Sequence, residues 1–313
     1  MYVAKFWARS SAPNPLDQAA HPLVQYGHSQ DSRSEAQTMA EQRLGEIIAQ
    51  LREGGKTDLQ QSLLSYQEVD PLREEFIDEK FLDHAHLAWT RNSYGSLVLN
   101  TDRIMFVDID FDEPSWLQSV RRWPSYFARR FIDKWKGREP LREAQQLWKN
   151  HHQLAQVEPR SAEELGAVQR LLLYYQQHPD LGGRLYRTKV GLRLLVTSHF
   201  FEPDSDLAQN LMMELGSDAL YVKLCRIQKS FRARLTAKPW RCGMKRHHFR
   251  YPYTPETAQE FAQWLAAYQD KQSAYQSCAF LCTIGAAEVV DDIRVCVELH
   301  DQACRALDHK PLA

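Results

Sequence analysis

The chain has 313 residues, 43% of them hydrophobic, so it can bury the core of one large domain or of two ordinary ones. Its 39 Lys and Arg nearly balance its 40 Asp and Glu, which excludes a uniformly basic or acidic protein. The sequence shows neither the apolar run of a signal peptide nor about 18 consecutive apolar residues, so we expect a cytoplasmic protein with no membrane partner. The six cysteines all lie in the last third, unlike a secreted disulfide framework, and reduced thiols are expected.

The N-terminal part predicts a small α/β unit over about residues 1–85. The segment YVAKFWAR has the composition of a strand, and after a polar loop an amphipathic helix is expected from Ser34 to Leu51. Residues 52–85 are polar and acidic, which favours connecting structure with a short helix.

The next part predicts consecutive antiparallel strands followed by a helical insertion. In residues 86–111, HLAWTRNSYGSLVLNTDRIMFVDIDF, β-rich runs alternate with turn signals such as Asn92–Gly95. The insertion is expected over about residues 114–180, where Ser161 and Glu164 have the spacing of a capping box.

The remaining elements complete a core that extends over residues 1–250. We expect a hairpin about Val190–Gly191, a helix from Ser205 to Leu215 and an alternating strand in KSFRARLT. Residues 251–313 predict a helix-strand-helix subdomain packed on that core. Because strands and helices mix without a βαβ rhythm, the fold class is predicted to be α+β with a mostly antiparallel sheet.

The stretch IMFVDIDFDE places carboxylates at the end of an apolar strand. Side chains two apart in a strand point the same way, so Asp108 and Asp110 share a face. Two converging carboxylates repel each other unless a cation lies between them, and oxygen ligands favour Mg²⁺ or Mn²⁺. The alternative is that these are solvated carboxylates at an ordinary strand end.

The C-terminal half contains a basic block, a segment with many Lys and Arg and no Asp or Glu. Residues 221–250 hold ten Lys and Arg and no acid, interleaved with aromatic rings, a composition that suits a phosphate backbone and stacked bases. Alternation places Arg232 and Arg234 on one strand face, where each planar guanidinium can hold a phosphate. Lys238, Trp240 and Arg241 follow directly. A solvated charged face remains the alternative.

Cysteine and histidine side chains offer a second kind of site. Cys242, His247 and His248, with Cys225 as a fourth ligand, could bind zinc, although the C-x4-H-H spacing fits no common zinc finger. Cys278 lies in an apolar run, which predicts a buried thiol.

The order of three motifs resembles that in archaeo-eukaryotic-type primases and primase-polymerases. These motifs are an apolar strand ending in Asp-x-Asp, then a basic hairpin, then a second basic strand. Asp108 and Asp110 match the first motif of that superfamily, which binds two catalytic metals. The segment TKVGLRLLV looks like its second, nucleotide-binding motif, with Arg193 in the place of the usual histidine. The third carboxylate of the superfamily, on a later strand, has no clear match.

The resemblance implies an RRM-like module and a divergent nucleotidyltransferase that transfers nucleoside monophosphates from NTPs or dNTPs by two-metal catalysis. It implies that Asp108 and Asp110 bind Mg²⁺ or Mn²⁺. Thr188, Lys189 and Arg193 would hold the nucleoside triphosphate, and Arg187 would join the basic residues that hold nucleic acid. The missing third carboxylate leaves two alternatives open. One is a non-catalytic protein of the same fold that binds single-stranded DNA or RNA, and the other is a metal-dependent nuclease.

Overall fold

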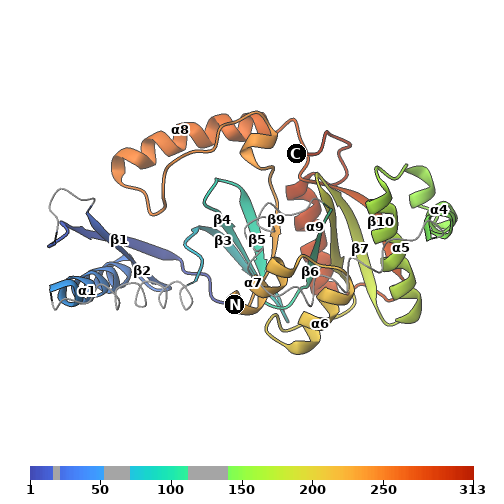
Figure 1. Cartoon of the computed structure of the whole chain (residues 1–313), viewed down its shortest axis with the longest axis horizontal. Helices are drawn as coiled ribbons and strands as arrows, with labels where there is room; N and C mark the ends of the chain where they lie inside the picture. Colours follow the sequence, from blue (N-terminus) through green and yellow to red (C-terminus); the bar gives the residue numbers. More distant parts are fainter. Residues whose placement is uncertain (17–21, 53–70, 112–139) are drawn as a thin grey trace. The chain divides into compact units, whose positions relative to one another are not determined.

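The computed structural model describes residues 1–16, 22–52, 71–111 and 140–313 (Figure 1). The chain forms two compact units, each assembled from three chain segments. Unit 1 comprises Met1–Phe81, His86–Thr101 and Ile227–Ser273, and unit 2 comprises Leu82–Ala85, Asp102–Arg226 and Ala274–Ala313. The boundary that the sequence suggested at residue 250 lies inside the third segment of unit 1, so each unit contains residues from both sides of it.

The fold is α+β with antiparallel sheets, as the sequence predicted. Within the described ranges the strands form one two-stranded and two four-stranded sheets, and each pairing between these strands is antiparallel. The RRM-like arrangement stays a prediction. No helix in the described part of the chain is both long and apolar enough to cross a bilayer.

A small antiparallel sheet packs on a long helix in unit 1. It pairs β1 (Phe6–Ala12) with β2 (Leu23–Ser29), and α1 spans Arg33–Arg52. A Cβ on Gly27 would lie 2.1 Å from the carbonyl oxygen of Ala36, so only glycine lets β2 approach the helix this closely. A loop was expected where β2 lies, and this was wrong because β2 has no fully apolar face: its burial is mostly intermediate.

The four-stranded sheet of unit 1 has the order β3-β4-β5-β9. Its strands are β3 (Glu75–Phe81), β4 (His86–Arg91), β5 (Leu97–Thr101) and β9 (Phe231–Arg234). Phe231 and Ala233 are buried while Arg232 and Arg234 face the other side, which confirms the predicted alternation. Residues 52–85 were expected to form connecting structure with a short helix, and β3 was not predicted there because it is an edge strand, where charged side chains are usual. The greater part of that range, residues 53–70, lies outside the described residues.

Aromatic side chains attach helix α8 (Pro255–Gln272) to the rest of unit 1. Thr254 caps its first turn by accepting a hydrogen bond from the Thr257 amide. The ring of Trp264 packs against that of His247, which precedes the helix, at 4.6 Å between centroids. Gly95, with φ of +91°, ends the turn between β4 and β5, and a Cβ there would lie 2.5 Å from the Trp264 ring.

The sheet of unit 2 lies between two helices (Figure 1). Its strand order is β10-β7-β8-β6, and the bounds are β6 (Phe106–Asp110), β7 (Gly182–Thr188), β8 (Gly191–Val196) and β10 (Cys278–Gly285). Helix α9 (Asp291–Cys304) covers one face, where the His300 ring contacts Tyr186 at 4.7 Å between centroids. Helix α5 (Ala162–Gln177) covers the other face, where Tyr175 lies against Gly183.

Neighbouring segments of unit 2 occupy both outer edges of this sheet. On β6, the carbonyl oxygen of Asp108 accepts a hydrogen bond from the Asp218 amide at 2.9 Å, in the connection between α6 (Asp206–Glu214) and α7 (Ala219–Gln228). On β10, the Phe280 amide donates to the carbonyl oxygen of Ala306 at 2.9 Å.

Part of the predicted helical insertion is observed. Helices α4 (Pro140–Asn150) and η2 (Leu154–Gln156) precede α5, while residues 112–139 lie outside the described ranges. The Ser161 hydroxyl accepts a hydrogen bond from the Glu164 amide at 3.2 Å, as a capping box requires. The Glu164 carboxylate, however, binds Arg187 instead of returning to the Ser161 amide.

Candidate functional site

The two strands that the resemblance singled out meet at a partly buried ion pair in unit 2. Strands β6 and β8 pair so that Asp108 lies opposite Arg193. Nε of Arg193 donates to Oδ1 of Asp108 at 3.0 Å, and the side chains are 3% and 32% exposed. Burial alone would lower the pKa of Arg193, but the Asp108 charge raises it, so the guanidinium remains protonated.

The second predicted metal ligand lies at the end of the same strand. Asp110 is exposed and lies opposite Gly191. Asp108 and Asp110 share a strand face, but one carboxylate oxygen of Asp108 already accepts a hydrogen bond from Arg193. Among the residues that the structure describes, neither carboxylate belongs to a group of three potential metal ligands.

The predicted nucleotide-binding residues of the hairpin do not converge on one point. Thr188 is buried at the end of β7, and Lys189 is exposed in the turn. Arg193 is directed into the protein toward Asp108. Arg187, predicted to contact nucleic acid, faces α5 and holds the fully buried Glu164 with two hydrogen bonds of 2.7 and 2.9 Å.

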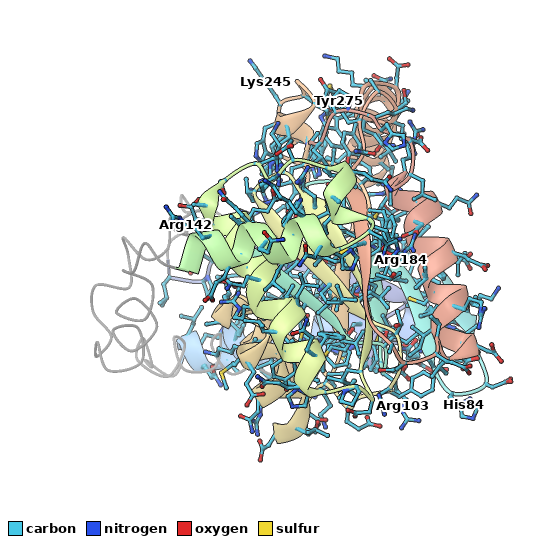
Figure 2. All side chains as sticks on the ribbon, turned by 90° about the vertical axis from the view of Figure 1, so that its right-hand side faces the viewer. His84, Arg103, Arg142, Arg184, Lys245 and Tyr275 are labelled. Atoms are coloured by element: carbon cyan, nitrogen blue, oxygen red, sulfur yellow. The ribbon has the colours of Figure 1, made fainter. Side chains whose placement is uncertain are left out.

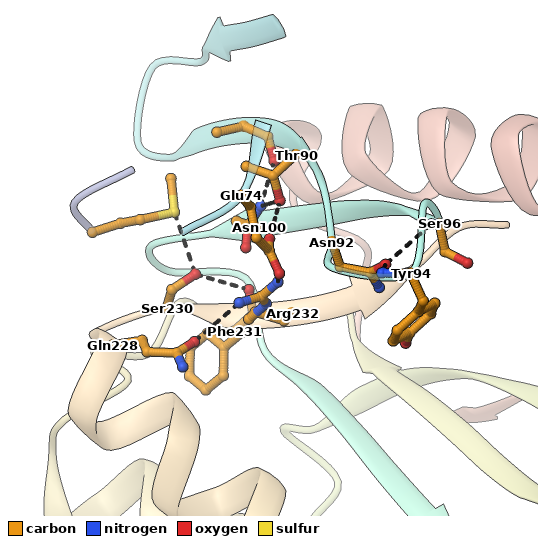
Figure 3. Close-up of polar contacts among 12 residues, drawn as sticks. Glu74, Thr90, Asn92, Tyr94, Ser96, Asn100, Gln228, Ser230, Phe231 and Arg232 are labelled. Carbon is orange, nitrogen blue, oxygen red and sulfur yellow. Dashed lines mark hydrogen bonds and ion pairs between the residues drawn. The ribbon is translucent and has the colours of Figure 1, made fainter. Parts of the chain in front are cut away.

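Arg232, the first predicted nucleic-acid contact of unit 1, is also held by an acid (Figure 3). Its Nη2 donates to both oxygens of Glu74 at 2.7 and 2.6 Å. Thr90 donates to the same carboxylate at 2.6 Å, and Asn100 donates to Thr90 at 2.9 Å. The basic block thus has a compensating acid that lies more than 150 residues earlier in the chain. Arg234 lies on the same face of β9, half-buried.

The other predicted contacts lie just after β9, on the short helix η3 (Pro239–Arg241). Trp240 is 50% exposed and meets the Tyr94 ring at 5.3 Å between centroids. The Lys238 ammonium lies 5.6 Å from the centre of the Trp240 ring, and Arg241 is half-buried. Exposed aromatic area therefore lies beside a cation here, while the predicted contact with nucleic acid stays a prediction.

A pocket of about 380 Å³ in unit 1 gathers further basic and aromatic residues. We call it the arginine pocket. Among the described residues that line it, none is acidic. Its charged and aromatic lining consists of Arg73, Arg91, Arg246, His247, His248, Phe249, Arg250, Tyr251 and Tyr253.

The arginines of this pocket differ in how far they are compensated. Nε of Arg91 pairs with Glu75 at 3.0 Å. Arg73 stacks on the Tyr26 ring, 3.6 Å from its centre, and burial together with the positive charge of Arg250 lowers the pKa of Arg73. Nη2 of Arg246 donates to the Ser93 hydroxyl at 3.3 Å. The pocket therefore concentrates positive charge, and an anion would relieve the repulsion.

His247 in the same pocket is buried and neutral at physiological pH. Its exposure is 6%, and burial, aided by the charge of Arg246, lowers its pKa to about 4. Within the described residues, neither ring nitrogen makes a hydrogen bond of standard geometry. The ring packs against Phe261 and Trp264 of α8.

The zinc ligands proposed from the sequence are not gathered in the structure. Cys242 donates its thiol hydrogen to the carbonyl oxygen of Pro239 at 3.2 Å. Cys225 belongs to unit 2, whereas Cys242, His247 and His248 belong to unit 1. Across the described ranges, these four residues do not form a group of three potential metal ligands. All six cysteines are free and buried, which confirms the expectation of reduced thiols.

A different set of cysteine and histidine side chains meets in the core of unit 2. We call Cys278, His300 and Cys304 the Cys-His-Cys cluster; their ligand atoms all lie within 4.8 Å of one another. Nε2 of His300 lies 3.5 Å from Sγ of Cys304 and 4.0 Å from Sγ of Cys278. It also lies 3.5 Å from Nη1 of Arg193. The cluster is fully buried.

Electrostatics within the cluster favours a charged Cys304. Although burial opposes every charged form, the attraction of the Cys304 thiolate raises the pKa of His300. Hydrogen bonding from Cys278 and the charge of His300 lower the pKa of Cys304. A thiolate is the form of cysteine that binds metals.

Neither the arginine pocket nor the Cys-His-Cys cluster was predicted from the sequence. One local signal was available, because His300 and Cys304 are four residues apart and so share a helix face. Cys278 reaches them only through the packing of β10 against α9, which spacing along the chain does not reveal.

Comparisons with known proteins add no constraint on either site. The chain matches no protein-family model, no curated protein and no solved structure.

Proposed function

We propose that this protein binds single-stranded DNA or RNA through the arginine pocket of unit 1. The observation that supports this most directly is the set of four arginines around one cavity whose described lining contains no acid. Such a pocket is costly without a ligand because like charges repel, although Glu75 already compensates Arg91. A phosphate group would compensate them.

The lining also suits the rest of a nucleotide. Guanidinium groups hold phosphate oxygens in pairs, and the rings of Phe249, Tyr251 and Tyr253 offer faces on which bases can stack. Stacking accepts any base, so the expected binding depends weakly on sequence. The exposed Trp240 with Lys238 lies in the same unit and offers a further stacking surface.

Replacing two exposed arginines of the pocket tests the proposal. For Arg246→Ala with Arg250→Ala we expect affinity for a labelled single-stranded oligonucleotide to fall, because each arginine can neutralise one phosphate. The slope of log affinity against log salt should become smaller by about 2. Fluorescence anisotropy of the labelled strand over a range of salt concentrations measures both quantities.

A matched control removes the same charge from the same basic block. Lys223→Ala with Arg226→Ala changes two exposed cations outside the pocket. Equal weakening by the control pair would show that binding follows net charge alone, and undiminished binding by the pocket pair would refute the proposed site.

A nucleotidyltransferase or nuclease that uses Mg²⁺ or Mn²⁺ is the second candidate. In favour of it, Asp108 lies on the same strand face as Asp110 and its side chain is about a third exposed. Against it, Arg193 already compensates the charge of the Asp108 carboxylate. Incubation with Mn²⁺, nucleotides and primer-template tests it, with Asp110→Asn as the inactive variant. Extension or degradation that this variant abolishes would favour an enzyme over a binding protein.

A further inference from the structure

We propose that the Cys-His-Cys cluster of unit 2 is a zinc site, with Sγ of Cys278, Nε2 of His300 and Sγ of Cys304 as its protein ligands. This site is separate from the arginine pocket, which belongs to unit 1.

The two sulfur–nitrogen separations in the cluster are close to those around zinc. With Zn–S and Zn–N bonds of about 2.3 and 2.0 Å, tetrahedral angles place sulfur and nitrogen about 3.5 Å apart. The observed separations from Nε2 of His300 are 3.5 Å to Cys304 and 4.0 Å to Cys278. An ion can therefore be accommodated with side-chain adjustments of a few tenths of an ångström.

Two elements of secondary structure bring the ligands together. His300 and Cys304 lie one turn apart at the C-terminal end of α9, and Cys278 is the first residue of β10. The C-terminal end of a helix carries partial negative charge, which favours a cation there.

The second ring nitrogen of His300 has the partner that metal-binding histidines usually have. Its Nδ1 lies 3.3 Å from Oδ1 of Asp301. The other oxygen of Asp301 binds Nε and Nη2 of Arg184, the side chain labelled in Figure 2, at 3.0 and 2.5 Å. A carboxylate held in this way fixes the imidazole so that Nε2 faces the two sulfur atoms.

The charges of the surroundings allow a buried dication. Two thiolates neutralise one Zn²⁺ ion, and the nearby Arg193 is compensated by Asp108. No net charge is therefore buried. The soft sulfur and imidazole donors favour zinc over the Mg²⁺ or Mn²⁺ expected for the carboxylates of β6. Three protein ligands leave one tetrahedral position for a water molecule or another small ligand.

Metal analysis of the full chain, purified under reducing conditions with zinc supplied, tests the proposal. We expect about one zinc per chain in the wild type, measured by plasma mass spectrometry, and loss of nearly all of it in Cys278→Ser and Cys304→Ser. Cys282→Ser and Cys296→Ser are matched controls, because both change buried cysteines on the same strand and the same helix. They should retain the metal.

A second measurement keeps the test valid if the ligand variants fail to fold. Wild-type protein that is stripped with a chelator and then loaded with Co²⁺ should show thiolate-to-cobalt charge-transfer absorption. Added zinc should displace the cobalt ion and abolish this absorption. Wild-type protein that retains neither zinc nor cobalt would overturn the proposal. So would equal metal loss in the control variants.

Discussion

At the scale of single residues, Asp108 has a role that its sequence position does not reveal. It compensates Arg193, whose side chain is only 3% exposed. An Asp108→Asn substitution would leave that guanidinium buried without its partner. Because Asp108 remains about a third exposed, we expect a loss of about 2–3 kcal/mol in the free energy of unfolding, measured by urea denaturation.

Asp110→Asn is the matched control, since Asp110 is exposed on the same strand face. Its effect on the free energy of unfolding should be about 0.5 kcal/mol or less. Similar losses in both variants would contradict the structural role assigned to Asp108.

His247 makes stability depend on pH. The folded protein protonates this ring only near pH 4, whereas the unfolded chain protonates it near pH 6.5. The neutral ring therefore contributes stability above about pH 6.5 that is lost as the pH falls toward 4. Between pH 8 and pH 5 we expect the free energy of unfolding to decrease by about 2 kcal/mol from this residue.

Urea denaturation at the two pH values tests this expectation. The His247→Phe variant should lose that part of the pH dependence, while His248→Phe, at the exposed neighbour, should keep it. A pH dependence unchanged in His247→Phe would exclude His247 as its source.

At the scale of strands and helices, sequence patterns predicted the elements that have one wholly apolar face. Strand β9 was predicted because Phe231 and Ala233 alternate with arginines. Helix α7 was missed because its basic residues were interpreted only as a binding surface, although Val222 and Cys225 form its buried stripe. Strands β2 and β3 have no such stripe and gain their structure from their partners.

The candidate site was predictable only in part, for a related reason. The sequence places Asp108 and Asp110 on one strand face, but it does not contain the strand register that sets Arg193 opposite Asp108. Nor does it show that Arg232 meets Glu74, more than 150 residues away. Ion pairs of this kind depend on tertiary structure, so residue composition alone overstates how much positive charge a basic block can offer to a ligand.

The ion pair between Arg232 of β9 and Glu74 should contribute to the stability of unit 1. Arg232→Leu should leave Glu74, 9% exposed, without its main partner and lower the free energy of unfolding by about 2–4 kcal/mol. The double variant Glu74→Leu with Arg232→Leu should recover much of that loss. A double variant no more stable than Arg232→Leu alone would contradict this account, as thermal and urea denaturation can show.

At the scale of the whole molecule, the chain passes between two units several times. Helix α8 of unit 1 and strand β10 with helix α9 of unit 2 all follow residue 250. A fragment of residues 1–250 would therefore expose parts of both cores. We expect it to unfold without a cooperative transition, measured by circular dichroism on heating, while the full chain unfolds cooperatively. Cooperative unfolding of the fragment would support the linear division into 1–250 and 251–313.

The covered edges of the unit 2 sheet have a consequence for self-association. Outward-facing backbone groups of β6 and β10 are engaged, through Asp108 to Asp218 and through Phe280 to Ala306. An exposed strand edge is a template on which a second polypeptide can add by β-augmentation or begin to aggregate. In unit 2, neighbouring segments cover both edge strands of the sheet. Displacing the segment near Asp218 or the one near Ala306 would expose an edge strand and make this unit prone to fibrillar assembly.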